Sequence, residues 1–458
     1  MKLQLLSDYT ARRQVVGWLM LAVGALALST LYAVLVVATR TPLLSGLPAT
    51  RELFRNVLVL HVSFAMIVWM LVCAASLWSL AAGSYSTLRR FAQILAYAGA
   101  LSMALTPLLG AAPAILANYV PVLDSRIFLA GLSCFALGIA LCGASAAGDI
   151  VRQLKANHYE VWHVGALLSI VAAAIAVGSF FTSLVQTGVP SSHANFEVLF
   201  WGPGHVLQFV HVLIMMTVWT VLGDYVLGRA IAPRRWLIGL LIAGVLPLLS
   251  VPYIHLSASV SSPESRSAFT ALMSWGAWPA AILMAAYLIM QLVQAGRAVP
   301  QGDNVWGKVE TLALALSLTL FILGCIFGAS INGETTMVTA HYHGTVGAVT
   351  LAYMGFGYRM LQTFGYTVGR LARWQLVVYS SGLLTLASSL AWLGTLGVPR
   401  KTPYVDQAEQ TLGTMAAMGL MGLGGLLSLT GIALFVFAIW RSIWMGGNKT
   451  VQRVSPHA

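Results

Sequence analysis

The hydrophobic and polar positions of this chain alternate in long blocks. Apolar runs, most of 20 residues or more, are separated by short polar segments along the whole sequence. A run of about 20 apolar residues crosses a bilayer as one helix. The pattern therefore predicts twelve spans, at 13–38, 56–82, 88–110, 126–148, 158–188, 196–228, 235–256, 267–294, 306–332, 336–364, 373–397 and 410–442. We expect an all-α integral membrane protein whose residues 1–458 form a single twelve-helix transmembrane domain.

Composition and charge favour the lipid bilayer as the solvent. Only 8% of the residues are charged, against roughly 25% in soluble domains. The net charge of +12 alone would also suit a nucleic-acid-binding protein, but 18 of the 25 Lys and Arg residues fall on one side of the predicted topology and 7 on the other. This positive-inside bias predicts a multi-pass membrane protein with both termini cytoplasmic and no nucleic-acid partner. We expect it in the bacterial cytoplasmic (inner) membrane.

The candidate functional residues of this chain are its histidines. Ionisable groups inside a membrane are costly and usually functional. Five of the ten histidines come from four different predicted spans and converge on one depth, near the outer side: His61, His205, His255, His341 and His343. The others are expected to be hydrogen-bonded or solvated imidazoles.

The most specific feature is the segment Thr-Ala-His-Tyr-His-Gly at 339–344. A two-residue step turns a helix by about 200°, so His341 and His343 should point to opposite faces. They cannot share one metal, but each can bind one of two haems that flank the helix, with His61 as a further axial ligand. The alternative is incidental polar packing.

A second landmark is Phe-Trp-Gly-Pro-Gly-His at 200–205. Gly202, Pro203 and Gly204 should loosen the helix, and the two glycines would let a flat cofactor approach the backbone next to His205. The alternative is a simple proline kink beside a structural histidine.

These residues resemble the catalytic subunit of the haem-copper oxidoreductase superfamily, which includes cytochrome c oxidases and bacterial nitric oxide reductases. The resemblance rests on the order and spacing of the histidines over nearly the whole chain. It extends to Gly-Val-Pro-Arg-Lys at 397–401, which is similar to a segment that binds haem propionates, and to Asn-Tyr-Val-Pro-Val-Leu-Asp at 118–124, which is similar to an outer loop.

The resemblance implies a role for each residue. His61 and His343 would ligate a low-spin haem, and His341 would be the proximal ligand of a high-spin haem. His205 and His255 would bind a distal copper or non-haem iron opposite the open face of that haem. The propionates would pair with Arg400 and Lys401.

The distal site departs from the family pattern. Only His255 stands where members usually have two adjacent histidines, and Phe209 stands where oxygen-reducing members often have a tyrosine. The site is therefore short of ligands, because a copper or non-haem iron normally takes at least three N or O ligands. Gln208, Tyr253 or water would have to complete it, or the site is weak or empty.

The leading hypothesis is a respiratory terminal reductase of a small gas, similar to nitric oxide reductases. A divergent oxygen reductase, a haem-binding electron-transfer or sensor protein without the distal metal, and a haem-free transporter are the alternatives. The four cysteines form neither CxxC nor CxxCH, so neither a disulfide framework nor a covalent haem is expected. Electrons should therefore enter through a membrane-anchored c-type cytochrome or a cupredoxin-like partner.

The carboxylates predict the direction of proton supply. Asp149, Glu160, Asp224 and Glu310 fall at the inner helix ends, where we expect them to be solvated, and none lies in mid-span. The carboxylates expected near the haems are Glu197 and Glu334, both on the outer side. We therefore expect protons to arrive from outside, without proton pumping, as the resemblance to nitric oxide reductases implies.

Overall fold

The structure is a computed structural model that describes residues 9–39, 48–110, 112–188, 190, 192–298, 305–400 and 411–452. Its helices are α1 (Tyr9–Thr39), α3 (Pro48–Val62), η1 (Ser63–Val68), α4 (Trp69–Ala82), α5 (Thr87–Leu105), η2 (Thr106–Leu108), α6 (Arg126–Lys155), α7 (Val161–Thr187), α8 (His193–Leu227), α9 (Arg234–Val245), η3 (Leu246–Ser250), α10 (Val251–Ser257), α11 (Pro263–Gly276), α12 (Pro279–Ala298), η4 (Val305–Gly307), α13 (Val309–Ala329), α14 (Thr336–Thr363), α15 (Leu371–Thr395) and α16 (Leu412–Gln452). Two short strands, β1 (Ala114–Ile115) and β2 (Val122–Leu123), lie between η2 and α6.

Every predicted span is helical, and among the described residues eleven helical segments are long and apolar enough to cross a membrane. The tenth predicted span is α14, which is not among the eleven. Its first turns carry threonines and the two histidines of the 339–344 segment, which lowers its hydropathy. The protein is a multi-pass membrane protein, and the count of twelve spans stays a prediction.

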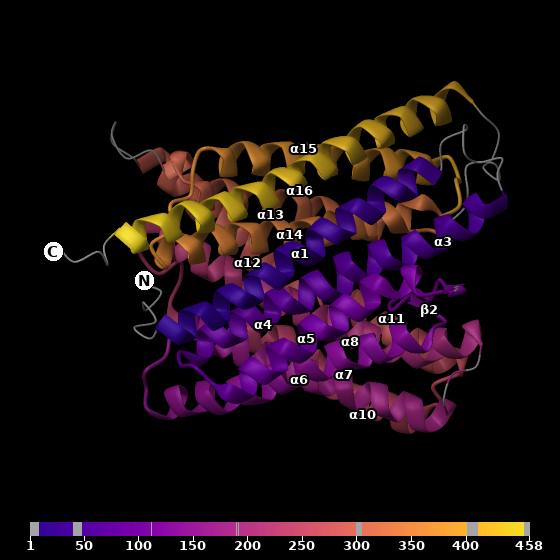
Figure 1. Cartoon of the computed structure of the whole chain (residues 1–458), viewed down its shortest axis with the longest axis horizontal. Helices are drawn as coiled ribbons and strands as arrows, with labels where there is room; N and C mark the ends of the chain where they lie inside the picture. Colours follow the sequence, from indigo (N-terminus) through magenta and orange to yellow (C-terminus); the bar gives the residue numbers. More distant parts are fainter. Residues whose placement is uncertain are drawn as a thin grey trace.

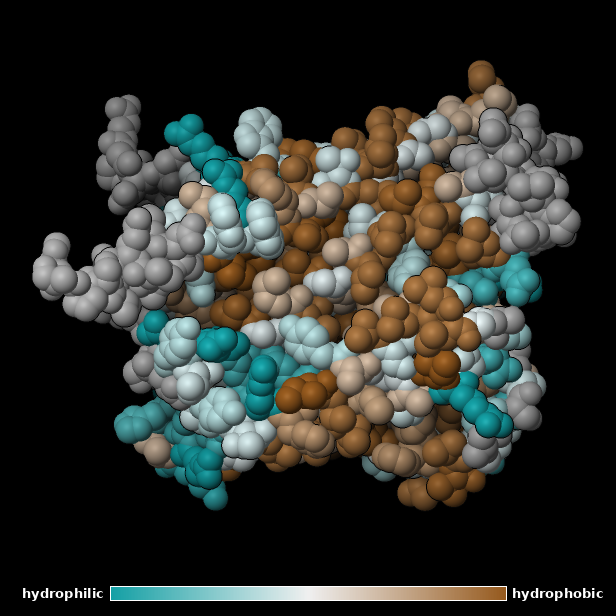
Figure 2. Space-filling view, viewed as in Figure 1, coloured by the Kyte–Doolittle hydropathy of each residue, from teal (hydrophilic) through white to brown (hydrophobic). Residues whose placement is uncertain are grey.

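The helices form an elongated bundle in which α1 begins and α16 ends at the same end (Figure 1). We call this the terminal end. On the face in Figure 2, hydrophobic residues cover much of the middle of the bundle, and hydrophilic residues gather mainly toward the two ends. That distribution is what a lipid-facing surface requires.

Helices that follow one another in the chain pack in pairs, among them α13 with α14 and α15 with α16. Glycines bring the backbones together: a Cβ at Gly344 would lie 2.6 Å from the Cα of Gly324. Small residues allow this approach in membranes, where dispersion contacts hold helices together. All residues of α4 are buried, as are most of the second half of α14 and much of α8. These central helices position the histidines.

The all-α prediction missed a small antiparallel hairpin. β1 pairs with β2 through Ala114↔Leu123 and Ile115↔Val122, and the strands contact α3 and α6. The loop of this hairpin lies at the end of the bundle opposite the terminal end (Figure 1), which we call the hairpin end. The segment 118–124, which resembled an outer loop of the superfamily, includes part of this loop and β2.

Candidate functional site: three anchored imidazoles and a histidine–tyrosine pair

His61 lies in the last turn of α3, directly before the π-helical turn η1. Such π-turns are frequent at functional sites. The Nδ1 atom of His61 lies 3.0 Å from the carbonyl oxygen of Ser29 in α1 and 3.0 Å from its hydroxyl. Its Nε2 atom has no hydrogen-bond partner among the described residues.

His341 and His343 are anchored in the same way. The Nδ1 atom of His341 lies 2.8 Å from the carbonyl oxygen of Gly324 in α13. That of His343 lies 2.8 Å from the carbonyl oxygen of Thr339, one turn earlier in α14. The two rings have different neighbours: Gly328 of α13 makes room for the ring of His341, whereas His343 is close enough to His61 for an electrostatic interaction.

The chemistry of these three imidazoles fits two haems. A backbone carbonyl can only accept, so in each ring Nδ1–H donates and Nε2 keeps its lone pair. This is the tautomer that a metal needs, and the hydrogen bond also fixes the ring. The pair His61 and His343 suits the two axial positions of one haem, and His341 suits one axial position of another.

His205 is fully buried in α8, one turn after Trp201. Its Nδ1 atom donates to the carbonyl oxygen of Trp201 at 2.7 Å, and its Nε2 atom accepts from the hydroxyl of Tyr119 at 2.8 Å. The rings of Tyr119 and His205 lie 4.5 Å apart. Burial, followed by the nearby charge of Glu197, raises the pKa of the Tyr119 phenol, so the phenol is the donor.

The helix around His205 differs from the expectation. α8 is continuous from His193 to Leu227 with Pro203 inside it. The space beside the two glycines is taken by side chains: a Cβ at Gly204 would lie 2.4 Å from Tyr119, and one at Gly202 would lie 2.8 Å from Phe269. The expected approach of a flat cofactor to these glycines is therefore wrong, because aromatic rings fill the positions.

His255, in α10, reaches the same region from another helix. Its Nε2 atom lies 2.8 Å from the hydroxyl of Ser179, and its Nδ1 atom is buried with no hydrogen-bond partner in the described part of the chain. The ring of Phe269 lies 5.2 Å from that of His255 and 6.2 Å from that of His205. The structure thus gathers the two predicted distal histidines around one aromatic ring.

Tyr253 and Gln208 were the candidate side chains for the missing third ligand, and the structure places them differently. Tyr253 is 72% exposed, so its assignment to the distal site is wrong: on the short helix α10 it points away from the bundle. Gln208 lies close to Tyr119. Within the described ranges, no group of three or more His, Cys, Asp or Glu side chains is placed to hold a metal ion.

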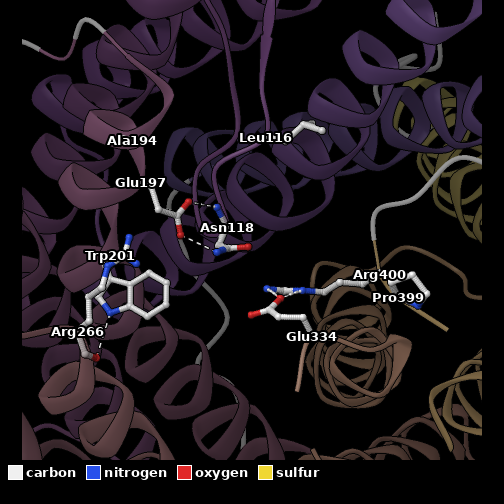
Figure 3. Close-up of a pocket in the computed structure, with 9 residues that line it drawn as sticks. All are labelled: Leu116, Asn118, Ala194, Glu197, Trp201, Arg266, Glu334, Pro399 and Arg400. Atoms are coloured by element: carbon white, nitrogen blue, oxygen red, sulfur yellow. Dashed lines mark hydrogen bonds and ion pairs between the residues drawn. The ribbon is translucent and has the colours of Figure 1, made fainter. Parts of the chain in front are cut away.

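A pocket of about 580 Å³ lies at the hairpin end. Figure 3 shows Glu334 paired with Arg400 on one side, and Glu197 bound to Asn118 on the other. The Nε atom of Arg400 lies 2.6 Å from the Glu334 carboxylate. Arg400, expected to pair with a propionate, thus already has an acidic partner, and Lys401 lies outside the described residues.

Two carboxylates at the terminal end are not solvated as expected. Asp224, near the end of α8, is 6% exposed and accepts from the backbone N–H of Ile231 at 2.8 Å. Glu310, in the first turn of α13, is 2% exposed, and one of its oxygens has no hydrogen-bond partner within the described ranges. The helix ends were located correctly, but the packing of α8 against α13 covers them.

Comparison with known proteins decides the family. The family described as "Cytochrome C and Quinol oxidase polypeptide I" matches residues 13–427. The chain belongs to this family. A haem-copper oxidase family member carries haems and a distal metal, and the chain is accordingly assigned as a membrane oxidoreductase of this superfamily.

Two relatives and a solved structure are similar to most of this chain. An uncharacterized protein of Rickettsia prowazekii is 24% identical over 449 residues, covering 84% of this chain and 88% of the relative. One of Aquifex aeolicus is 27% identical over 358 residues, covering 76% and 85%. The cryo-EM structure of a heme-copper terminal oxidase dimer has the same fold, with a TM-score of 0.74 and 15% identity over 95% of this chain and 84% of that one.

Tyr119 is the site residue that the sequence did not single out. It lies in the 118–124 segment, whose likeness to a superfamily loop was the available signal. What the segment could not indicate is that the loop folds inward against α8, where the missing Cβ of Gly204 leaves room for it.

Proposed function

We propose that this haem-copper oxidase family member is the catalytic subunit of a membrane terminal reductase of a diatomic gas. The observation that carries the proposal is the set of three imidazoles anchored through Nδ1, on α3 and α14. His61 and His343 would hold a low-spin haem, and His341 would hold a high-spin haem. When bound, haem iron passes single electrons and binds a gas at an open axial position.

The chain's own residues orient this chemistry. The carbonyl of Gly324 fixes the ring of His341, and that of Ser29 fixes the ring of His61. His341 and His343 stand two residues apart on α14, and His61 comes from α3, so the residues that would hold the two haems are gathered around one helix. Arg400, which is paired with Glu334, would supply positive charge for a haem propionate.

The substrate that we propose first is nitric oxide. Its support is the placement of carboxylates: Glu197 and Glu334 line the pocket at the hairpin end, which we assign to the outer side, and so they offer protons from outside. Phe209, one turn after His205, is fully buried and carries no hydroxyl. A two-electron reduction of nitric oxide does not require a phenol at that position.

Oxygen is the second candidate, and Tyr119 favours it. The phenol missing at Phe209 is supplied by a different element, 2.8 Å from the Nε2 atom of His205. The buried carboxyls of Asp224 and Glu310 also offer proton-binding groups at the terminal end. Oxygen turnover would draw protons from that side.

Gas consumption by the purified protein with an artificial electron donor separates these substrates. The proposal expects nitric oxide turnover well above oxygen turnover, with both lost in His341→Ala. In proteoliposomes with an impermeant pH probe, Glu197→Gln should slow proton uptake from the hairpin side, whereas Glu310→Gln should not. Oxygen turnover without nitric oxide turnover, with uptake slowed by Glu310→Gln, would establish the second candidate.

We also propose an electron-donating partner, a membrane-anchored c-type cytochrome or a cupredoxin-like subunit, in the bacterial inner membrane. Its support is that the four cysteines of the chain are all free, so the chain offers no paired thiolates for a copper centre. Full turnover of the isolated chain with a soluble donor would count against an obligate partner.

A further inference from the structure

The contact between Tyr119 and His205 joins two elements 86 residues apart in the sequence. The hydroxyl of Tyr119 points at Nε2, which is the only ring nitrogen of His205 that can bind a metal, since Nδ1 donates to Trp201. A phenol therefore stands in the coordination position of the predicted distal ligand. The inference drawn from this contact rests on the distal metal site of the proposed function.

Tyr119 is held in this place from several sides. The Glu197 carboxylate accepts hydrogen bonds from the backbone N–H and the side-chain amide of Asn118, at 2.8 and 2.6 Å (Figure 3). Gly204 leaves room for the Cβ of Tyr119, and Trp201 meets the Tyr119 ring edge-on at 5.6 Å. The phenol is thus preorganised against His205 before any ligand binds.

The same loop is fixed at its other end beside His61. The hydroxyl of Ser63, in η1, donates to the carbonyl oxygen of Pro121 at 3.2 Å, and the contact is buried. Two hydrogen-bonded attachments, one at α8 and one at η1, hold the loop across the end of the bundle. Positions fixed in this way are the ones at which a metal centre can be built without large rearrangement.

The separation of the two donor atoms suits two neighbouring ligands of one ion. A transition metal lies about 2.0–2.2 Å from a histidine nitrogen or an oxygen ligand. The two donor atoms lie 2.8 Å apart, and an ion at such a distance from each of them would see them at an angle of roughly 80–90°. This is the angle between adjacent ligands in square-planar or octahedral geometry.

We infer that Tyr119 is a protein ligand of the distal metal next to His205, and that it supplies the ligand that the sequence lacks beside His255. The bound cation is the largest local charge, and it replaces the phenol proton, which leaves to water. The phenolate oxygen suits oxidised copper or iron, and it would take the place of the second histidine that is missing beside His255.

Tyr119→Phe tests this inference, with Tyr32→Phe as the control. Both variants remove one hydroxyl and keep the ring; the Tyr32 hydroxyl donates to the carbonyl oxygen of Ala104 at 3.1 Å in another part of the bundle. Each purified protein is loaded with Cu(II) or Fe(II), and its non-haem metal is measured as total metal minus haem iron. Affinity is measured by competition with a chelator.

The expected result is one non-haem metal per chain in wild type and in Tyr32→Phe. Tyr119→Phe should bind the ion at least tenfold more weakly, with both haem spectra unchanged. Resonance Raman spectra of the oxidised, loaded wild type should show phenolate vibrations that are absent from Tyr119→Phe.

Two outcomes would overturn the inference. Equal metal affinity in Tyr119→Phe and wild type, without phenolate vibrations, removes Tyr119 from the ligand set and leaves the proposed function intact. A wild type that binds both haems but takes up neither Cu(II) nor Fe(II) removes the ion itself. The proposed function fails separately, if wild type binds no haem or consumes neither gas.

Discussion

Gly328→Ala tests the positioning of His341 without replacing any proposed haem ligand. A Cβ at Gly328 would lie 2.6 Å from the Nδ1 atom of His341 and 2.9 Å from its Cε1, about 1 Å closer than ordinary contact. The ring must move, and its hydrogen bond to Gly324 breaks. The lost bond costs about 1 kcal/mol and the overpacking about 1 kcal/mol more. Together they weaken axial ligation roughly 30-fold.

The assay is the carbon monoxide difference spectrum of the reduced protein, which reports the haem with an open axial position. Gly328→Ala should lose most of the carbon monoxide-reactive haem and keep the low-spin bands, since His61 and His343 are not displaced. Gly178→Ala is the control, because a Cβ there meets nothing within 4 Å. In both variants alanine favours the helix, so general unfolding is not the expected cause. A full carbon monoxide signal in Gly328→Ala would refute the reasoning.

Two further predictions concern other parts of the bundle. His61→Ala should abolish the low-spin spectrum and leave high-spin absorbance, and an intact low-spin signal would remove His61 from the ligands. Arg89→Ala should destabilise the protein by about 3–5 kcal/mol, seen as a lower melting temperature in detergent, because the fully buried guanidinium pairs with Asp149 at 2.5 Å. Arg152→Ala removes an 80% exposed side chain from the same carboxylate and should leave the melting temperature unchanged; equal shifts in the two variants would contradict this account.

The positions of the helices were readable from the sequence because the bilayer leaves the backbone few choices. A chain in lipid must satisfy its N–H and C=O groups internally, so an apolar run of sufficient length becomes a helix. The segment 56–82 was predicted as one helix and is one span, although η1 interrupts its regular turns. The hairpin of β1 and β2 gave no such signal, because two-residue strands have no recognisable periodicity.

In α14, polar residues of the candidate site make the hydropathy rule for membrane-spanning helices harder to apply. The histidines and threonines that make this helix a haem-binding candidate also make it the least lipid-like of the predicted spans. From Gly344 onward its buried residues are surrounded by other helices. The sequence pattern alone does not separate a polar helix inside a bundle from one that does not span.

The burial of the carboxylates could not be predicted from their position in the sequence. Glu310 was correctly placed at a helix end, and its solvation was assumed from that position. Burial depends on which helix covers the end, and α8 and α13 meet there although their sequences are far apart. The same holds for Arg400, whose partner Glu334 lies 66 residues earlier in the chain.

The sequence by itself determined the helical membrane fold and predicted the histidines that we propose as haem ligands, because hydropathy and the 100° turn per residue are local properties. Only the tertiary structure decided which nitrogen of each imidazole remains available, since Ser29, Gly324 and Thr339 are selected by packing. It also decided that Tyr119 meets His205. That contact depends on a loop folding back over α8, and loop closure between distant segments leaves no periodic trace in a sequence.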